Sequence, residues 1–291
     1  MRIPGLRGLS PVRLIKYSVL RFREHDMATY AAAVTYHVSF SLFPFIIFFI
    51  ALLGFLHLPN FFDWLRQQAQ AFFLQQTMHQ INQIFDQLQQ RRMGILSVGA
   101  IVALWAASSG MRAVINALNV VYGVKESRPM WKRYSLSLLY TLGIGVLLAI
   151  AITLVLGSPH AMQEVARQVG ISQTFATLWA WWLRWPAVVV LLTLTVAAVY
   201  GLAPDVEQRF RFVSPGAFLA VVVWIATSLA FNYYVRTVVD YNVLYGSVGT
   251  IIVLLLYFFI SSLVLLFGAE INAVVEHHAA TGKDIGDRKL K

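Results

Sequence analysis

Long stretches without charged residues divide this chain into apolar segments and short polar connections. Six mainly apolar windows of 19 to 36 residues contain no Asp, Glu, Lys or Arg. Each is continuously apolar, whereas membrane strands alternate between apolar and polar positions, so the pattern indicates helices. A bilayer core needs about 20 helical residues, so each window has room for one spanning helix. The predicted spans are about 30–56, 93–111, 135–157, 182–203, 214–235 and 247–269.

The composition agrees with a membrane protein. Hydrophobic residues make up 58% of the chain and charged residues 12%, about half the charge of a soluble domain. Cysteine is absent, which excludes disulfides and thiolate metal sites. We therefore predict an all-α, polytopic membrane bundle of six transmembrane helices with amphipathic interfacial helices. Its parts are a cytoplasmic basic arm (1–28), a six-span membrane domain (29–272) and a cytoplasmic tail (273–291).

The distribution of positive charge predicts the orientation. With six alternating spans, 17 of the 23 Lys and Arg residues fall on the side of the two termini and six on the other. The positive-inside rule then places both termini in the cytoplasm. The basic arm faces anionic lipid headgroups, which attract each Lys or Arg by about 1 kcal/mol. Membrane lipids therefore account for the net charge of +10, and no nucleic-acid partner is expected.

Two connections show helical apolar periodicity without being apolar enough to span. Within residues 57–92, a Gln-rich stretch repeats large apolar side chains at helical spacing. This favours an amphipathic helix that either lies on the membrane surface or packs against the bundle, and the pattern leaves both open. After the second span, residues 111–122 have one apolar and one polar face. They predict a short interfacial helix on the cytoplasmic side.

His37 and Pro44 are the candidate functional residues of the first span. A polar ring at membrane depth is costly and marks a functional candidate. The alternative for His37 is a purely structural hydrogen bond to a neighbouring helix. Pro44 removes one helical hydrogen bond and is expected to kink the span, which serves either gating or packing.

Arg112 and Glu270 are candidates near the cytoplasmic face. Glu270 follows the sixth span and should lie at or just below the inner headgroups. It would line a cytoplasmic opening, with Arg112 or Arg209 as partner, or else form a structural interfacial ion pair. The adjacent His277 and His278 are expected to be solvated in the tail.

Catalytic signatures are missing from the sequence. The seven histidines form no HxH or HExxH arrangement, and no GxSxG, P-loop or GxGxxG motif is present. We therefore expect no catalytic residue, no metal site, no cofactor and no enzymatic activity.

Four segments, in order over about 25–276, resemble signatures of the YihY/BrkB family of bacterial inner-membrane proteins. They are AAAVTYHVSFSLFPFIIFFIALLG, LWAASSGMRAVINALNVVYGV, YGLAPDVEQRFRFVSPGAFLAVVVW and YNVLYGSVGTIIVLLLYFFISSLVLLFGAEINA. The resemblance implies a multi-pass inner-membrane protein with six spans and cytoplasmic termini. Members have carried a ribonuclease or a serum-resistance label, and transport of lipid or another envelope component has been suggested for the family. Phosphodiester hydrolysis usually uses metal ligands or paired acid and base groups, which do not cluster in this sequence.

The leading functional hypothesis is a transporter or flippase-like protein that moves a lipid or another amphipathic envelope component. The alternative is a structural scaffold that recruits partners, either further copies of the chain or envelope proteins. A third hypothesis is a membrane-bound hydrolase. The identity of the substrate and the energy coupling do not follow from the sequence.

Overall fold

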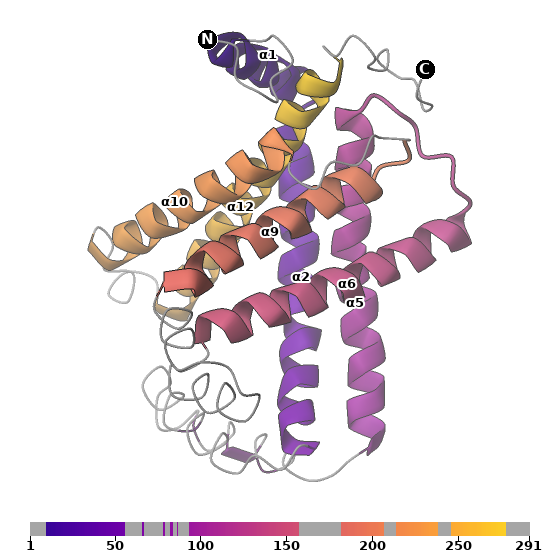
Figure 1. Cartoon of the computed structure of the whole chain (residues 1–291). Coiled ribbons are helices and arrows are strands. Elements are labelled where there is room, and N and C mark those ends of the chain that lie inside the picture. The colour runs from indigo at the N-terminus through magenta and orange to yellow at the C-terminus, as the bar shows by residue number, and fades with distance from the viewer. Residues whose placement is uncertain are drawn as a thin grey trace, which may run out of the picture. The chain divides into compact units, whose positions relative to one another are not determined.

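The structure is a computed structural model, and it describes residues 10–55, 66, 78, 82–83, 86, 93–156, 182–206, 214–237 and 246–277. These residues form helices and no strand, which confirms the predicted all-α class (Figure 1). The long helices are α1 (Pro11–Glu24), α2 (Met27–Phe55), α5 (Met93–Val121), α6 (Met130–Leu156), α9 (Arg184–Leu202), α10 (Pro215–Thr237) and α12 (Gly246–His277).

The chain forms two compact units. The first comprises Met1–Tyr36 and Met111–Lys291, and the second comprises His37–Gly110. Helices α2 and α5 each contribute one end to each unit. The two units are described separately below.

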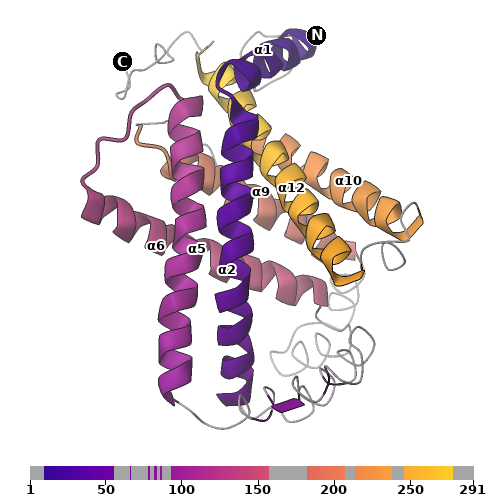
Figure 2. The same ribbon diagram turned by 180° about the vertical axis from the view of Figure 1, so that it is seen from behind.

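In the first unit, helices far apart in the sequence pack as consecutive neighbours. Helix α9 lies between α6 and α10, and α12 lies between α10 and α1. Figures 1 and 2 show that α6, α9 and α10 run in alternating directions. The contact between α1 and α12 has an apolar core, in which a buried leucine of α1 meets side chains of α12. Its members are Leu14, Ile271, Val274 and Val275, with Phe267 packed against them.

In the second unit, the C-terminal part of α2 lies beside the N-terminal part of α5 in both views (Figures 1 and 2). Small residues of α5 are buried here, namely Ala103, Ala106 and Gly110. A Cβ atom added at Gly110 would lie 3.6 Å from the Val38 side chain. Small side chains allow helix backbones to approach closely, which is how helices associate in a membrane.

Four helical segments are long and apolar enough to cross a bilayer: Val98–Val121, Arg184–Leu202, Pro215–Val235 and Ile251–His277. Helices α2 and α6, with 29 and 27 residues, begin and end close to the predicted first and third spans. The helices are therefore consistent with a helical membrane protein. The count of six crossings stays a prediction.

Helix α5 differs from the predicted pattern. It continues without a break to Val121, so the segment predicted as a separate interfacial helix forms the last turns of α5. No proline or glycine interrupts residues 111–121, and Ile115, Leu118 and Val121 are fully buried. The candidate span correspondingly runs over Val98–Val121 rather than 93–111.

Most of the 57–92 connection lies outside the described residues, as do residues 1–9 of the basic arm and 278–291 of the tail. Within the connection, Arg66 and Asp86 form an ion pair at 2.6 Å.

Candidate functional site

Glu270 lies near the C-terminal end of α12 with its side chain fully buried (0% exposed). The ring Nδ1 of His25 lies 2.6 Å from Glu270 Oε1, and Arg21 Nε lies 4.0 Å from Oε2. An ionised carboxylate only accepts hydrogen bonds, so in the ion-paired state His25 donates. Burying such a charge is costly unless it is paired, which explains why these two residues face it.

The turn between α1 and α2 positions His25. Ser10 caps the start of α1 by accepting a hydrogen bond from the Arg13 backbone N–H at 3.4 Å, and Pro11 occupies the first turn. At the other end, Asp26 adopts a left-handed conformation with φ 49°, which Asp tolerates better than most residues. The chain therefore turns at His25 and Asp26, so that α1 lies against α12.

Arg21 also contacts a second residue of α12. Its guanidinium lies 2.7 Å from the Nδ1 atom of His277. Arg can only donate, so His277 Nδ1 accepts and carries no proton, which makes this ring neutral in the arrangement seen. We call this group of side chains the Glu270 cluster; its members are Arg21, His25, Glu270 and His277. Within the described part of the chain, Glu270 Oε2 is buried without a hydrogen-bond partner.

A close crossing of α10 and α12 lies next to the cluster. A Cβ atom at Gly216 would be 2.1 Å from the carbonyl oxygen of Gly268, and one at Gly268 would be 2.6 Å from Ala220 Cβ. Only glycine fits at both positions. Asn272 joins the same two helices, because its Oδ1 accepts from the Gly216 N–H at 2.7 Å and its Nδ2 donates to Ser214 Oγ at 2.9 Å. It thereby satisfies an N–H group that a helix start leaves unpaired.

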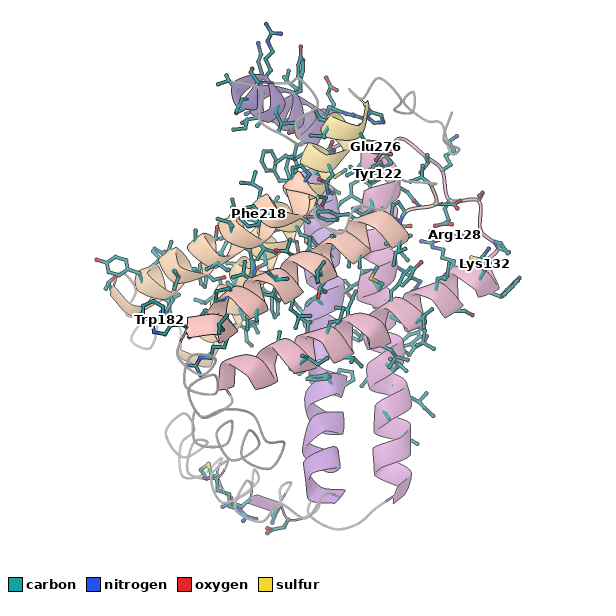
Figure 3. All side chains as sticks on the ribbon, in the orientation of Figure 1. Tyr122, Arg128, Lys132, Trp182, Phe218 and Glu276 are labelled. Atoms are coloured by element: carbon teal, nitrogen blue, oxygen red, sulfur yellow. The ribbon has the colours of Figure 1, made fainter. Side chains whose placement is uncertain are left out.

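A polar network joins the connection after α5 to the end of α9. Arg128 donates to both carboxylate oxygens of Glu126, at 2.6 and 2.9 Å, and lies 3.7 Å from Asp205. Asn119 donates to Glu126 at 3.0 Å and accepts from the Asp205 N–H at 2.7 Å. These four residues are called the Glu126 network. Figure 3 shows Arg128 in the connection and Tyr122 at the end of α5.

The charges in this network shift two pKa values. Burial by itself would raise the pKa of Glu126, but the hydrogen bond and charge of Arg128 outweigh it, so the pKa lies below its usual value. Burial by itself would lower the pKa of Arg128. The pKa is raised instead, because Arg128 is hydrogen-bonded to Glu126 and lies near the negative charges of Glu126 and Asp205. Both residues are therefore held in their charged forms.

The network depends on how α5 ends. Gly123 adopts a left-handed conformation with φ 68°, and the Val124 N–H donates to the Asn119 carbonyl at 2.9 Å. This is the hydrogen-bond pattern of a glycine C-cap, which stops the helix and turns the chain away. The turn leaves Asn119 beside Glu126.

The predicted candidates are divided between the two units. His37 and Pro44 belong to the second unit, whereas Arg112 and Glu270 belong to the first. In the second unit, His37 Nδ1 lies 3.1 Å from Ser109 Oγ. The Ser109 hydroxyl already donates to the Ala106 carbonyl at 2.6 Å, so the His37 ring is the donor. Helix α2 runs through Pro44 without interruption.

The Glu270 carboxylate pairs with His25 and Arg21, an ion pair of the kind that the structural alternative predicted. Arg112 instead packs its guanidinium over the Tyr134 ring at 4.4 Å and lies 3.4 Å from Ser137 Oγ. Arg209 lies outside the described residues. His277 was also expected in solvent, but it accepts the hydrogen bond from Arg21.

Sequence reasoning missed the polar face of α1. Leu14, Arg21 and His25 meet α12, and Ser18 is fully buried on the same face. Their spacing of four, three and four places them on one helical face, so the repeat was present in the sequence. That face mixes apolar and charged residues. Its sequence pattern is therefore typical of a helix face exposed to solvent, and it does not indicate that α12 packs there.

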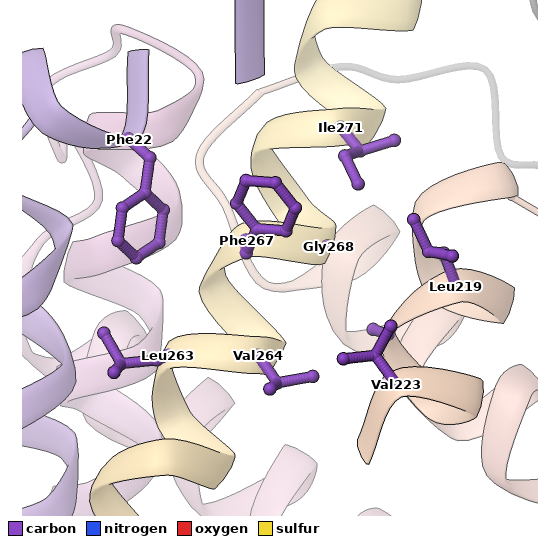
Figure 4. Close-up of a pocket in the computed structure, with 9 residues that line it drawn as sticks. Phe22, Leu219, Val223, Leu263, Val264, Phe267, Gly268 and Ile271 are labelled. Atoms are coloured by element: carbon purple, nitrogen blue, oxygen red, sulfur yellow. The ribbon is translucent and has the colours of Figure 1, made fainter. Parts of the chain in front are cut away.

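An apolar groove lies beside the Glu270 cluster, between α1, α10 and α12. Its volume is about 270 Å³, and the described residues that line it are apolar or glycine. Figure 4 shows Leu219 and Val223 of α10 on one side, with Phe267 and Ile271 of α12 next to them. Phe22 of α1 closes one end, its ring in an edge-to-face contact with Phe267 at 5.8 Å between centroids.

The comparisons with known proteins agree with the resemblance seen in the sequence. A family model described as virulence factor BrkB matches residues 18–290. The "Putative ribonuclease-like protein YfkH" of Bacillus subtilis is 34% identical over 88% of this chain and 92% of its own length. No solved structure matches the chain.

Two further relatives are both named UPF0761 membrane protein. The one from Chromohalobacter salexigens is 28% identical over 90% of this chain, which covers 63% of that longer relative. The one from Haemophilus influenzae is 22% identical over 88% of this chain and 92% of its own length. With a family model that matches almost the whole length and helices able to cross a bilayer, the chain is a membrane protein that belongs to the BrkB family.

Proposed function

We propose that this protein moves a lipid or another amphipathic component of the envelope across the bacterial inner membrane, with both of its termini in the cytoplasm. The observation that carries the proposal is the apolar groove, about 270 Å³, set between two candidate spans and the basic helix α1. An amphipathic molecule needs an apolar surface and a polar one side by side. The groove and the charged residues of α1 supply both.

The Glu270 cluster supports the proposal because it places charge next to the groove. Ile271 and Phe267 line the groove, and Glu270 lies between them in the sequence of α12. Ionisable residues in apolar spans are costly, and they commonly mark the pathway of a substrate or ion. The same cluster fastens α1 to α12, so a change in its charge would alter how α1 covers the groove.

The test is lipid movement in proteoliposomes of the purified full chain. A fluorescent phospholipid in both leaflets is reduced from outside by dithionite, and the proposal expects the inner-leaflet fraction to become accessible faster than in empty vesicles. The assay is run with and without a proton gradient. No acceleration in either condition would overturn the proposal and would favour a scaffold.

The alternative hypothesis of a membrane-bound hydrolase predicts turnover of a substrate rather than lipid movement. The ribonuclease-like name belongs to the Bacillus relative. Metal-assisted hydrolysis needs a group of ligands, and among the described residues no cluster of three His, Asp or Glu residues could hold a metal ion. Turnover of RNA or lipid by the purified protein, dependent on added divalent metal, would replace the transport proposal.

A further inference from the structure

We infer that the apolar groove binds one acyl chain of an anionic phospholipid from the cytoplasmic leaflet, with the headgroup beside the basic face of α1. This inference rests on the proposed function and names the substrate class for the same site. It follows from the chemistry of the groove, the faces of α1 and the charges beside them.

The walls of the groove accept hydrocarbon and little else. Among the described residues, nine line the groove, and all are apolar or glycine, so they offer no polar side chain to an occupant. A peptide placed there would lose the hydration of its backbone groups without compensation. The volume of about 270 Å³ lies below the usual range for drug-sized ligands, which suits a single chain rather than a ring system.

The surroundings of the groove are also apolar. On α10, Phe218 and Val222 are exposed beside Leu219 and Val223, which line the groove. Helix α10 is a candidate span, so these side chains would face lipid tails. An acyl chain can therefore enter the groove sideways from the bilayer.

Helix α1 has a second apolar face that leads to the groove. Val12, Ile15 and Val19 are exposed, and they share one helical face with Phe22, which lines the groove. Leu14 and Ser18 are buried on a different face, and Leu14 packs against α12 there. A helix packed on one side and apolar on another suits a position at the surface of the bilayer.

The charge beside this second face selects the headgroup. Lys16 and Arg23 are exposed, lie seven residues apart on one side of α1, and adjoin the Val12–Val19 face. Neither forms an ion pair with another of the described residues, whereas Arg21 is engaged by Glu270 and His277. Two cations next to an apolar groove complement an anionic headgroup above an acyl chain.

Photocrosslinking of lipid tests the inference directly. The full chain is placed in phosphatidylcholine nanodiscs that contain a trace of phosphatidylglycerol with a diazirine at the chain end. A matched set contains diazirine phosphatidylcholine with the same chains. After irradiation, mass spectrometry maps the labelled residues, and we expect Val223 and Phe267 to be labelled more strongly by phosphatidylglycerol.

Two variants separate the groove from the headgroup site. Val223→Trp fills the groove and should abolish labelling of Phe267, whereas Val222→Trp, next to it on the exposed face of α10, should not. K16Q/R23Q changes exposed residues only and should keep the groove labelled. It should lower the preference for phosphatidylglycerol by about fivefold per charge removed, from the attraction of about 1 kcal/mol per basic residue.

The outcomes are distinct from those of the transport assay. Equal labelling by both lipids, labelling that V223W leaves unchanged, or protein–protein crosslinks at the groove between two copies would each overturn the inference. Accelerated lipid movement without groove labelling would overturn the inference alone. Groove labelling without lipid movement would support the inference and contradict the proposed transport.

Discussion

At the scale of single residues, Glu270 shows how a buried charge organises its surroundings. Its carboxylate meets Arg21 of α1 at 4.0 Å and His25, in the turn after α1, at 2.6 Å, although 245 residues separate His25 from Glu270. Sequence reasoning identified Glu270 because a carboxylate at the edge of an apolar helix is conspicuous. It did not identify His25 or Arg21, because the N-terminal arm contains several basic residues and their sequence pattern does not indicate which of them contacts Glu270.

We predict that Glu270→Gln destabilises the protein and loosens α1. The amide keeps the shape of the side chain but loses the charge that Arg21 and His25 face, and hydrogen bonds to charged groups contribute about 1.5–3 kcal/mol. Thermal unfolding in detergent measures the loss. Trypsin cleavage at Arg21 or Arg23 should become faster, since α1 detaches more readily.

The control is Leu266→Val, an equally buried position of α12 where the change removes one methylene group. Its cost should be about 1 kcal/mol, with no change in cleavage of α1. If E270Q were no more damaging than L266V and left cleavage unchanged, Glu270 would be a packing residue.

The Glu126 network predicts a dependence on pH. Since the folded protein lowers the pKa of Glu126, its ion pair contributes stability in full above the ordinary value of 4.5. That contribution is lost as the pH falls through the lowered folded pKa. Hydrogen exchange at the Arg128 amide, which donates to Glu126 at 3.2 Å, reports the state of the pair.

The comparison for this measurement is Glu126→Gln. At pH 7 the wild-type amide should be better protected than that of E126Q, and the difference should shrink as the pH falls well below 4.5. A difference that stays constant or grows on acidification would show that the ion pair does not stabilise the connection.

At the scale of helices, the crossing of α10 and α12 depends on two glycines. We predict that Gly268→Ala destabilises the protein by about 1–3 kcal/mol, the usual cost of overpacking. The added Cβ would lie 2.6 Å from Ala220 Cβ and 2.8 Å from the Gly216 carbonyl oxygen, and the backbone of α10 cannot yield locally. Thermal unfolding and the lipid assay both measure the effect.

Helix α6 offers the matched control. Gly143 and Gly145 have no atom within 4 Å of an added Cβ, so alanine there meets open space. Because alanine favours the helix over glycine by about 0.5–1 kcal/mol, G143A should be neutral or stabilising. Equal losses for G268A and G143A would argue against the close crossing.

Helix positions follow from the sequence better than helix ends and partners do. The charge-free windows predicted each of the six long apolar helices, because a continuous apolar run has few alternatives to helix. Two C-terminal ends were placed short, since α5 continues to Val121 and α12 to His277. The glycine crossing was missed because Gly216 and Gly268 reveal their role only when α10 and α12 meet.

At the scale of the whole molecule, both proposals place the groove and α1 at the cytoplasmic side of a multi-pass bundle. The excess of positive charge on the side of the termini predicts this orientation, and four helices meet the requirements of a span. The absence of cysteine allows a direct test, because any single cysteine introduced is the sole target of a thiol reagent.

The most direct test is labelling of single cysteines in intact cells with a membrane-impermeant maleimide. Cysteines at Ser10, next to α1, and at Lys125, in the connection after α5, should react only after the cells are lysed. Cysteines at Gln75 and Gln168, on the opposite side of the predicted six-span chain, should react in intact cells whose outer membrane has been permeabilised. Labelling of Ser10 and Lys125 from outside, or protection of Gln75 and Gln168 until lysis, would contradict the account.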